Sequence, residues 1–311
     1  MTENFVWTEK YRPQNLNGCV LSETLKKTFD AFIEQMEVPN LLLTGPPGVG
    51  KTTVAKAMLN QMDRDCYMIN GSMSGNIDTL RNEISNFASS VSFLGGRKYV
   101  ILDEADYLNP NSFQPALRGF MEEFSKNCGF ILTCNFTNKI IEPLRSRLSI
   151  IDFRIPKDER PKIASQYMKK VQYILKDENI PYDQIVLAKL IMHYFPDLRR
   201  VINELQSYSS TGQIDVGILS FSNDKKYGEL ITALSKKDFT AMRKWVVENY
   251  DSDVAFFRRF YDSLNDVFQP TSVPVAIDLI AKYMFQHAFV ADPEINLVAM
   301  LTNIMLECEF K

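Results

Sequence analysis

The sequence predicts an α/β fold in which a parallel five-stranded sheet is followed by two groups of helices. Three observations predict it. Short apolar runs are separated by helical patterns in the first half of the chain, these runs lack polar alternation, and strand signals fade after about residue 160. Apolar strands separated by helices are typical of a parallel sheet covered on both faces. With 311 residues, 45% of them hydrophobic, the chain can bury a large core in more than one domain.

The predicted strands are the five apolar runs, and they span residues 40–44, 66–70, 98–103, 129–135 and 149–155. Helical patterns such as KTTVAKAMLNQM and TLRNEISNFASSV lie between most of them. The stretch 135–148 is the exception, because it is too short for a long crossover helix.

Helices are predicted at 161–177, 183–194 and 197–208, with Asp197 as the cap of the last. A further group of helices begins near residue 226 and shows no site chemistry. We therefore predict three domains, residues 1–155, 156–225 and 226–311.

Composition excludes several classes of protein. The net charge of −3 argues against a surface coated in basic residues, so any contact with nucleic acid must come from a local patch. The apolar runs are shorter than the roughly 18 residues of a membrane helix, and no membrane partner is expected. Five scattered cysteines without a C-x-x-C pair predict reduced thiols in a cytoplasmic protein, and the two isolated histidines argue against a zinc site.

A phosphate-binding loop lies between the first predicted strand and a helix. The segment GPPGVGKT matches the pattern G-x-x-x-x-G-K-[ST], whose glycines let backbone N–H groups approach phosphate oxygens at a helix N-terminus. We predict ATP as the ligand, with Lys51 reaching the β- and γ-phosphates and Thr52 binding Mg²⁺. The predicted nucleotide contacts are Gly45, Pro46, Pro47, Gly48, Val49, Gly50, Lys51, Thr52 and Thr53.

Acidic and amide side chains follow the next strands. Asp103 ends the strand YVILD, where a carboxylate can hold Mg²⁺, and Glu104 is predicted to polarise the attacking water. Asn135 ends the strand ILTCN, where its amide can hydrogen-bond both the γ-phosphate and the water. The chain is therefore predicted to be an ATP hydrolase.

Three arginines extend the predicted site. Arg145 and Arg147 follow the fourth strand and are expected on the outer surface, away from their own phosphate-binding loop. An arginine that cannot reach its own site suggests action on a neighbour's nucleotide, since arginine stabilises charge on a transferring phosphoryl group. Arg199, in the second domain, is expected to close over the chain's own nucleotide.

Together these motifs resemble the AAA+ ATPases, and more narrowly the sliding-clamp loaders of replication factor C type. The narrower resemblance rests on the order and spacing of WTEKYRP, PNLLLTGPPGVGKT, LDEADYLN, QPALRGFMEEFSKNCGFILTCN, IIEPLRSR and DLRRVINELQ. Within this family the chain is most similar to the large subunits of T-even-type bacteriophages. The resemblance covers roughly residues 5 to 210.

The resemblance implies an AAA+ P-loop domain, a helical lid and a helical collar. It implies that Tyr11, Arg12 and Pro13 flank adenine, that Arg147 serves an adjacent subunit's ATP, and that Arg199 senses its own nucleotide. It also implies that Gln114 and Arg118 link DNA binding to hydrolysis. The DNA contacts it implies are Asn76, Arg81 and Arg118.

The chain departs from the expected pattern at three positions, Leu148, Asn76 and Pro115. In the family, the arginine that acts on an adjacent subunit's ATP belongs to a Ser-Arg-Cys motif. Here the motif reads Ser146-Arg147-Leu148, and the loss of the cysteine changes packing but keeps the guanidinium. Asn76 stands where relatives carry a basic residue, which weakens the expected contact there. Pro115 interrupts a helix pattern and is tolerable if that helix begins near Ser112, which places the proline in the first turn.

The resemblance implies a loader in which ATP binding assembles a spiral that opens the clamp and binds primer–template DNA, and hydrolysis releases the loaded clamp. Its implied partners are the clamp, the DNA, copies of itself, a small loader subunit and, indirectly, a DNA polymerase. The clamp contact is expected near residues 108–113. Two alternatives are another AAA+ DNA motor, such as a helicase loader or branch-migration ATPase, and a scaffold subunit that binds nucleotide without hydrolysing it.

Overall fold

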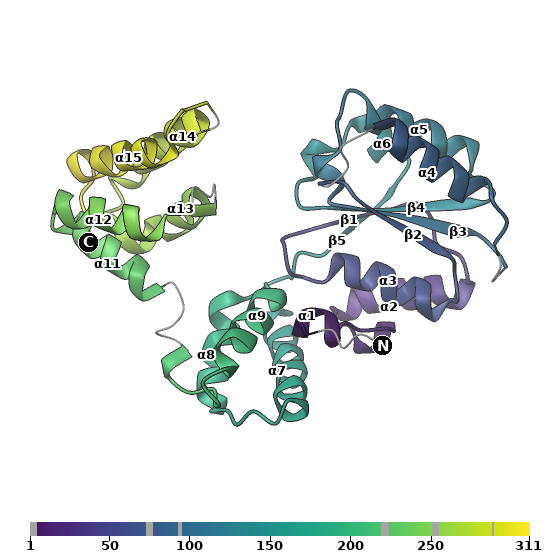
Figure 1. Ribbon diagram of the computed structural model, residues 1–311, viewed down its shortest axis with the longest axis horizontal. Coiled ribbons are helices and arrows are strands. Elements are labelled where there is room, and N and C mark those ends of the chain that lie inside the picture. Colours follow the sequence, from purple (N-terminus) through teal and green to yellow (C-terminus); the bar gives the residue numbers. More distant parts are fainter. Residues whose placement is uncertain (1–4, 73–76, 93–94, 219–223, 251–254, 288) are drawn as a thin grey trace. The chain divides into compact units, whose positions relative to one another are not determined.

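The computed structural model describes residues 5–72, 77–92, 95–218, 224–250, 255–287 and 289–311 (Figure 1). The chain divides into two compact units, and the division falls after Ile218. Among the described residues, no helix is long and apolar enough to cross a membrane.

A parallel sheet of five strands, in the order β2-β3-β4-β1-β5, forms the centre of the first unit. The strands are β1 (Leu41–Thr44), β2 (Cys66–Asn70), β3 (Lys98–Asp103), β4 (Cys128–Cys134) and β5 (Ser149–Asp152). All residues of β1 and β4 are buried, as expected for strands covered on both faces. The predicted fold class is confirmed, and the fifth strand ends at Asp152, three residues earlier than predicted.

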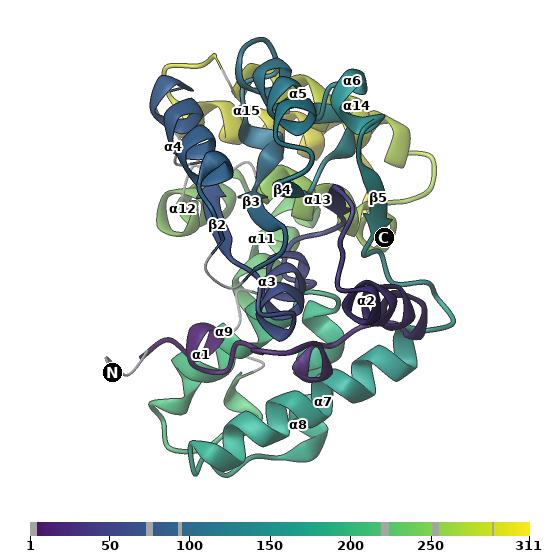
Figure 2. The same ribbon diagram turned by 90° about the vertical axis from the view of Figure 1, so that its right-hand side faces the viewer.

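Helices cover both faces of this sheet (Figures 1 and 2). One face is covered by α4 (Ile77–Ser89), α5 (Phe113–Glu123) and α6 (Glu142–Arg145), and the other by α2 (Glu23–Gln35) and α3 (Lys51–Gln61). Separate hydrophobic cores fill the two sides, with Leu117 and Leu144 in one and Phe29 and Met58 in the other.

The two local predictions for this region are confirmed. Helix α5 follows the N-cap Ser112, so Pro115 lies in the first turn, where no intrahelical N–H bond is lost. Between β4 and β5 there are only η3 (Thr137–Lys139) and the four-residue α6, with no crossover helix.

Three helices follow the sheet within the same unit, close to their predicted bounds: α7 (Arg160–Asp177), α8 (Gln184–Tyr194) and α9 (Leu198–Ser209). Asp197 caps α9, because its carboxylate accepts a hydrogen bond from the N–H of Arg200 at 3.0 Å. The short N-terminal helix α1 (Trp7–Lys10) packs against α9, although the two are far apart in sequence (Figure 1).

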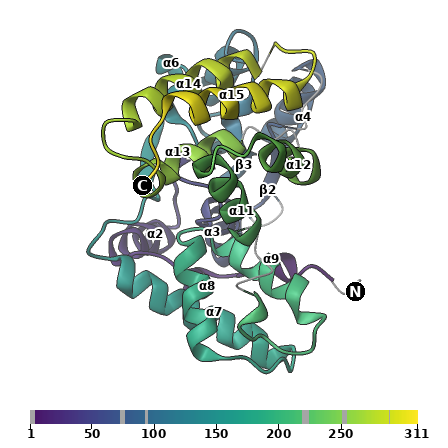
Figure 3. The ribbon, with the colours of Figure 1, turned by 90° about the vertical axis from the view of Figure 1, so that its left-hand side faces the viewer.

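The second unit is helical over its described residues. It contains α11 (Asp224–Ser235), α12 (Phe239–Asn249), α13 (Ala255–Val267), α14 (Val273–His287) and α15 (Pro293–Glu307), and α14 and α15 lie side by side (Figure 3). Its core is rich in aromatic and aliphatic side chains, among them Phe257, Phe260 and Leu301. The predicted last group of helices is confirmed.

Candidate functional site

The phosphate-binding loop joins β1 to α3 at the carboxyl edge of the sheet. Gly48 and Gly50 have φ angles of +72° and +93°, a left-handed conformation that glycine adopts without strain. Helix α3 starts at Lys51 with Gly50 as its N-cap, and no side chain caps its first N–H groups. A Cβ added to Gly50 would meet no atom within 4 Å, so the loop borders open space at a helix N-terminus. This arrangement fits an anionic phosphate group.

Lys51 is held inside this loop by three oxygen atoms. Its Nζ donates to the carbonyl oxygens of Gly45 at 2.7 Å and Pro46 at 2.8 Å, and to Oδ1 of Asn135 at 2.9 Å. The residue is only 8% exposed. Burial lowers the pKa of its ammonium group, an effect that nearby Cys134, Asp103 and Asp106 oppose. Lys51 and Asn135, 84 residues apart, are therefore brought into direct contact.

Thr52 and Asp103 also meet directly. The Thr52 hydroxyl donates to Oδ1 of Asp103 at 2.5 Å, and the same oxygen accepts a hydrogen bond from the Thr133 hydroxyl at 2.6 Å. A carboxylate and a hydroxyl beside a phosphate-binding loop are the hard oxygen donors that Mg²⁺ prefers. Thr133, which the sequence analysis did not single out, fixes the orientation of this carboxylate.

Glu104 follows Asp103 in a left-handed backbone conformation, with φ 54° and ψ 45°. This conformation is uncommon for a residue other than glycine. The N–H of Glu104 donates to the Thr133 hydroxyl at 3.1 Å, which anchors the turn. Glu104 lines the same cavity as Lys51, Thr52 and Asn135.

Asp106 holds the end of β4 in place and was missed as a site residue. Its Oδ2 accepts hydrogen bonds from the N–H groups of Asn135 and Phe136, both at 3.2 Å, and the residue is 6% exposed. The motif LDEAD contains this residue. Its position three residues after the end of β3 could have marked Asp106 as a candidate, but the sequence does not show which groups it bonds to.

A second cavity adjoins the loop, and it is bordered by the N-terminal segment, the start of α3, and helices α7 and α9. The predicted base-contacting residues Tyr11, Arg12 and Pro13 all line it. Arg199, at the start of α9, lines both this cavity and the one that holds Glu104. Further lining residues that the sequence analysis did not single out are Cys19, Val20, Tyr167 and Lys170.

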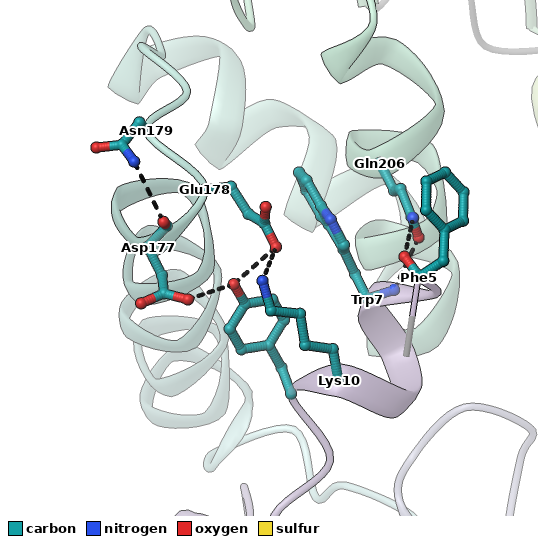
Figure 4. Close-up of polar contacts among 8 residues, drawn as sticks. Phe5, Trp7, Lys10, Asp177, Glu178, Asn179 and Gln206 are labelled. Carbon is teal, nitrogen blue, oxygen red and sulfur yellow. Dashed lines mark hydrogen bonds and ion pairs between the residues drawn. The ribbon is translucent and has the colours of Figure 1, made fainter. Parts of the chain in front are cut away.

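The N-terminal segment reaches this cavity because helices α7 and α9 hold it (Figure 4). The Tyr11 hydroxyl lies 2.6 Å from Oδ2 of Asp177 and 2.7 Å from Oε1 of Glu178, and the Lys10 ammonium lies 2.9 Å from the same Glu178 oxygen. The backbone N–H of Trp7 donates to the side-chain oxygen of Gln206 at 2.9 Å. A movement of these helices would therefore carry Tyr11 with it.

Gly48 lies against the beginning of α9. A Cβ added to it would fall 1.7 Å from Oδ1 of Asp197, which is the cap of that helix. The loop and the helix that carries Arg199 can approach this closely only because residue 48 has no side chain.

We expect Gly48→Ala to lower the thermal stability of the chain. A non-glycine residue in the left-handed region costs roughly 1–2 kcal/mol, and displacement of Asp197 adds to that cost. The control is Gly228→Ala in α11, where an added Cβ meets nothing within 4 Å and the backbone is helical, so stability is expected to be kept or raised. Equal melting temperatures for Gly48→Ala and the unaltered chain would contradict the close packing of Gly48 on Asp197.

Arg145 and Arg147 were expected to lie away from their own phosphate-binding loop. Among the described residues, neither of them lines either cavity. Arg145 pairs with Glu142 on α6. Arg147 pairs with Glu122 on α5, at 2.7 Å between its Nη2 and Oε1 of the carboxylate.

Two of the three predicted DNA-contacting residues can be placed. Arg81 is exposed on α4 and Arg118 is exposed on α5, whereas Asn76 lies outside the described residues. Gln114, on the same helix as Arg118, is buried. Its amide donates to the carbonyl of Lys139 at 3.0 Å and accepts from the N–H of Ile141 at 2.8 Å.

The predicted clamp-contacting stretch, residues 108–113, is only partly on the surface. Leu108 and Phe113 belong to the hydrophobic core, and residues 109–111 are exposed. The neighbouring Tyr107 is 61% exposed.

The chain matches two family models. One is the AAA family of ATPases associated with various cellular activities, over residues 41–157. The other is the AAA+ ATPase lid domain of the sliding-clamp-loader large subunit, over residues 159–220.

Similar proteins cover nearly the whole chain. The sliding-clamp-loader large subunits of Enterobacteria phage T4 and Escherichia phage RB69 are each 34% identical to it. The alignments cover 97% and 100% of this chain and 96% and 98% of those proteins. The replication factor C small subunit of Sulfurisphaera tokodaii is 32% identical, over 98% of this chain and 96% of its own length.

A solved structure with a similar fold is the RuvB Holliday junction branch migration motor of Thermotoga maritima. Its TM-score is 0.56, and the similarity covers 75% of this chain and 81% of that one. At 17% identity this likeness establishes a shared fold and no shared activity.

Proposed function

The chain belongs to the sliding-clamp-loader large-subunit family of AAA+ ATPases, and we propose that it binds ATP with Mg²⁺ at its interfaces with neighbouring subunits. It is the ATPase subunit of a DNA sliding-clamp loader: ATP binding assembles a spiral that opens the clamp and binds primer–template DNA, and hydrolysis releases the loaded clamp. We assign residues 1–155 to the ATPase domain, 156–225 to the lid and 226–311 to the collar.

The contact between Lys51 and Asn135, beside that between Thr52 and Asp103, is the observation that carries the proposal. It places a cation, an amide, a hydroxyl and a carboxylate together at a helix N-terminus. In our proposal the Lys51 ammonium exchanges its carbonyl partners for oxygens of the β- and γ-phosphates, and the loop residues 45–53 supply backbone N–H groups.

Thr52 and Asp103 are proposed to hold the metal ion. When bound there, Mg²⁺ would neutralise charge on the phosphate oxygens. Thr133 keeps the Asp103 carboxylate turned toward Thr52 through its 2.6 Å hydrogen bond.

Glu104 and Asn135 are proposed to orient the attacking water, with the Glu104 carboxylate polarising its O–H bond. Arg199 is proposed to close on the nucleotide from α9, since it lines both cavities. Tyr11, Arg12 and Pro13 are proposed to flank adenine in the second cavity.

Arg147 is proposed to act on the ATP of a neighbouring copy of the chain. It lies outside the two cavities of its own chain and carries a guanidinium suited to phosphate oxygens. This role requires that the loader contain more than one ATPase subunit.

The proposed partners are the sliding clamp, primer–template DNA, copies of this chain and a small loader subunit, with a DNA polymerase acting afterwards on the loaded clamp. The exposed residues 107 and 109–111 are the proposed clamp contact. We place the protein in the cytoplasm, which for a phage protein is that of the host.

Arg81 and Arg118 are proposed to contact DNA phosphates, with Asn76 as a weaker third contact. Their alanine variants are expected to weaken binding of primed DNA about equally for all sequences. Each should also flatten the salt dependence by up to about 0.9 in log–log slope, the value for one lost phosphate contact. The control is Arg160→Ala, which removes an exposed arginine from α7. An unchanged slope in the Arg81, Arg118 double variant would place the DNA elsewhere.

The experiment that tests the function is steady-state ATP hydrolysis with the small subunit, measured with and without clamp and primed DNA. Strong stimulation only when both are present is expected of a loader. Stimulation by DNA alone would favour another AAA+ DNA motor, and no hydrolysis under any condition would favour a nucleotide-binding scaffold. The presence of Lys51, Glu104 and Arg147 argues against a scaffold.

A further inference from the structure

The Arg147 guanidinium is already oriented by its own chain. Its Nε and Nη2 donate to the same oxygen of Glu122, Oε1, at 2.9 and 2.7 Å, and its Nη1 donates to the carbonyl of Pro143 at 2.8 Å. The edge formed by Nε and Nη2 therefore faces α5, and Nη1 is bonded to α6. A lone surface arginine would sample many rotamers instead.

These bonds leave the end of the guanidinium available. Arginine has five N–H donors, one on Nε and two on each terminal nitrogen. Three are used, so one N–H on Nη1 and one on Nη2 donate to no acceptor among the described residues. A donor on each terminal nitrogen suits two oxygens of one phosphate group.

Glu122 belongs to the same helix as Gln114 and Arg118. The three are spaced by four residues, so they follow one stripe of α5. Gln114 binds the backbone of Lys139 and Ile141, and Glu122 binds Arg147. Helix α5 thus holds the segment between β4 and β5 at two places, and the second is the arginine itself.

We propose that Glu122 is a positioning residue for Arg147, which it aims at the ATP of the neighbouring subunit. This inference rests on the proposed action of Arg147 in trans. Glu122 lines neither cavity of its own chain, so it is not placed to touch the nucleotide or the attacking water there. Its side chain is 57% exposed, and exposed ion pairs contribute little to stability, so its variants should fold.

The test is an assembly of two kinds of mutant subunit, in which only one kind of interface can hydrolyse ATP. Arg147→Ala subunits keep a sound nucleotide pocket, and Lys51→Ala subunits keep a sound arginine. When both are mixed with the small subunit, clamp and primed DNA, ATP is hydrolysed only at interfaces where the nucleotide pocket of an Arg147→Ala subunit meets the arginine of a Lys51→Ala subunit. Glu122→Ala is then added to one kind of subunit at a time.

In the Lys51→Ala subunit, Glu122→Ala should lower hydrolysis roughly 10- to 100-fold, the scale expected when a catalytic group is misplaced by about 1 Å. In the Arg147→Ala subunit it should change nothing, because that subunit has no arginine to position. Glu122→Gln in the Lys51→Ala subunit keeps an acceptor oxygen and should lose less. The control is Glu123→Ala in that subunit, which removes a carboxylate from the next position of α5 and should have no effect.

Four results would overturn the inference. Equal loss with Glu122→Ala in either kind of subunit would mean that Glu122 acts through a group other than Arg147. Unchanged hydrolysis with Glu122→Ala in the Lys51→Ala subunit would mean that the ion pair does not position the arginine. Faster hydrolysis would mean that Glu122 blocks the arginine. If the mixture of Arg147→Ala and Lys51→Ala subunits is inactive before Glu122 is changed, Arg147 does not act in trans, and this inference fails with that proposal. If that mixture is active and Glu122→Ala does not change its rate, only the role of Glu122 is contradicted.

Discussion

Arg147→Ala and Lys51→Ala subunits, each inactive alone, are expected to recover ATP hydrolysis when mixed in one assembly. An arginine that acts in trans is typically worth 10³–10⁵ in rate, or roughly 4–7 kcal/mol of barrier. Its loss should nearly abolish turnover while each Arg147→Ala subunit still binds ATP. Lys51→Ala should have the opposite defect, since the buried ammonium lies inside the phosphate-binding loop of its own subunit.

The mixed assembly separates action within a subunit from action between subunits. If Arg147 acts in trans, some interfaces join an intact pocket to an intact arginine, and hydrolysis returns at intermediate mixing ratios. If it acts within its own subunit, every pocket lacks one essential group and no ratio restores activity. Light scattering should confirm that the mixture assembles, and a fluorescent ATP analogue should confirm binding by the Arg147→Ala subunits.

Much of the sheet and its edge could be predicted because the sequence encodes them locally. The apolar runs of β1, β3 and β4 are buried nearly throughout, so their lack of polar alternation was a direct sign of coverage on both faces. The carboxyl ends of parallel strands share one edge, and polar residues that end separate strands therefore meet there. Asp103 and Asn135 lie at that edge for this reason.

Contacts that depend on tertiary placement could not be predicted. Asp106 and Thr133 look like ordinary loop and strand residues, and their roles appear only when β3 and β4 are paired. The pairing of Glu122 with Arg147 joins residues 25 apart through the particular orientation of α5. No periodicity or spacing specifies which of several exposed glutamates meets that arginine.

The N-terminal segment illustrates the same limit. The motif WTEKYRP indicates a base pocket only by resemblance. The physical reason for its position is the set of bonds from Trp7, Lys10 and Tyr11 to α7, α9 and Glu178, more than 160 residues later. These partners are the polar residues Asp177 and Glu178 at the end of α7 and Gln206 in the last turn of α9, and a sequence pattern does not distinguish them from their neighbours.

Glu104→Gln is expected to leave ATP binding intact and to lower turnover by about 10²–10⁴-fold, the usual contribution of a group that acts as a general base. The amide keeps the size of the side chain and part of its hydrogen bonding, and removes the charge that polarises water. The backbone should be unaffected, since the left-handed turn is held by the bond from the Glu104 N–H to Thr133, which does not involve the side chain.

Mixing again locates the defect. Glu104 lines the nucleotide cavity of its own chain, so a Glu104→Gln subunit should keep a working Arg147. It should therefore restore hydrolysis when mixed with Arg147→Ala subunits, and should fail to do so with Lys51→Ala subunits, because both then lack a working pocket. Titration with a fluorescent ATP analogue should show normal affinity for Glu104→Gln and weakened affinity for Lys51→Ala. Turnover by Glu104→Gln at the rate of the unaltered chain would remove Glu104 from the catalytic site, and the attacking water would then have to be activated by Asn135 and the phosphate itself.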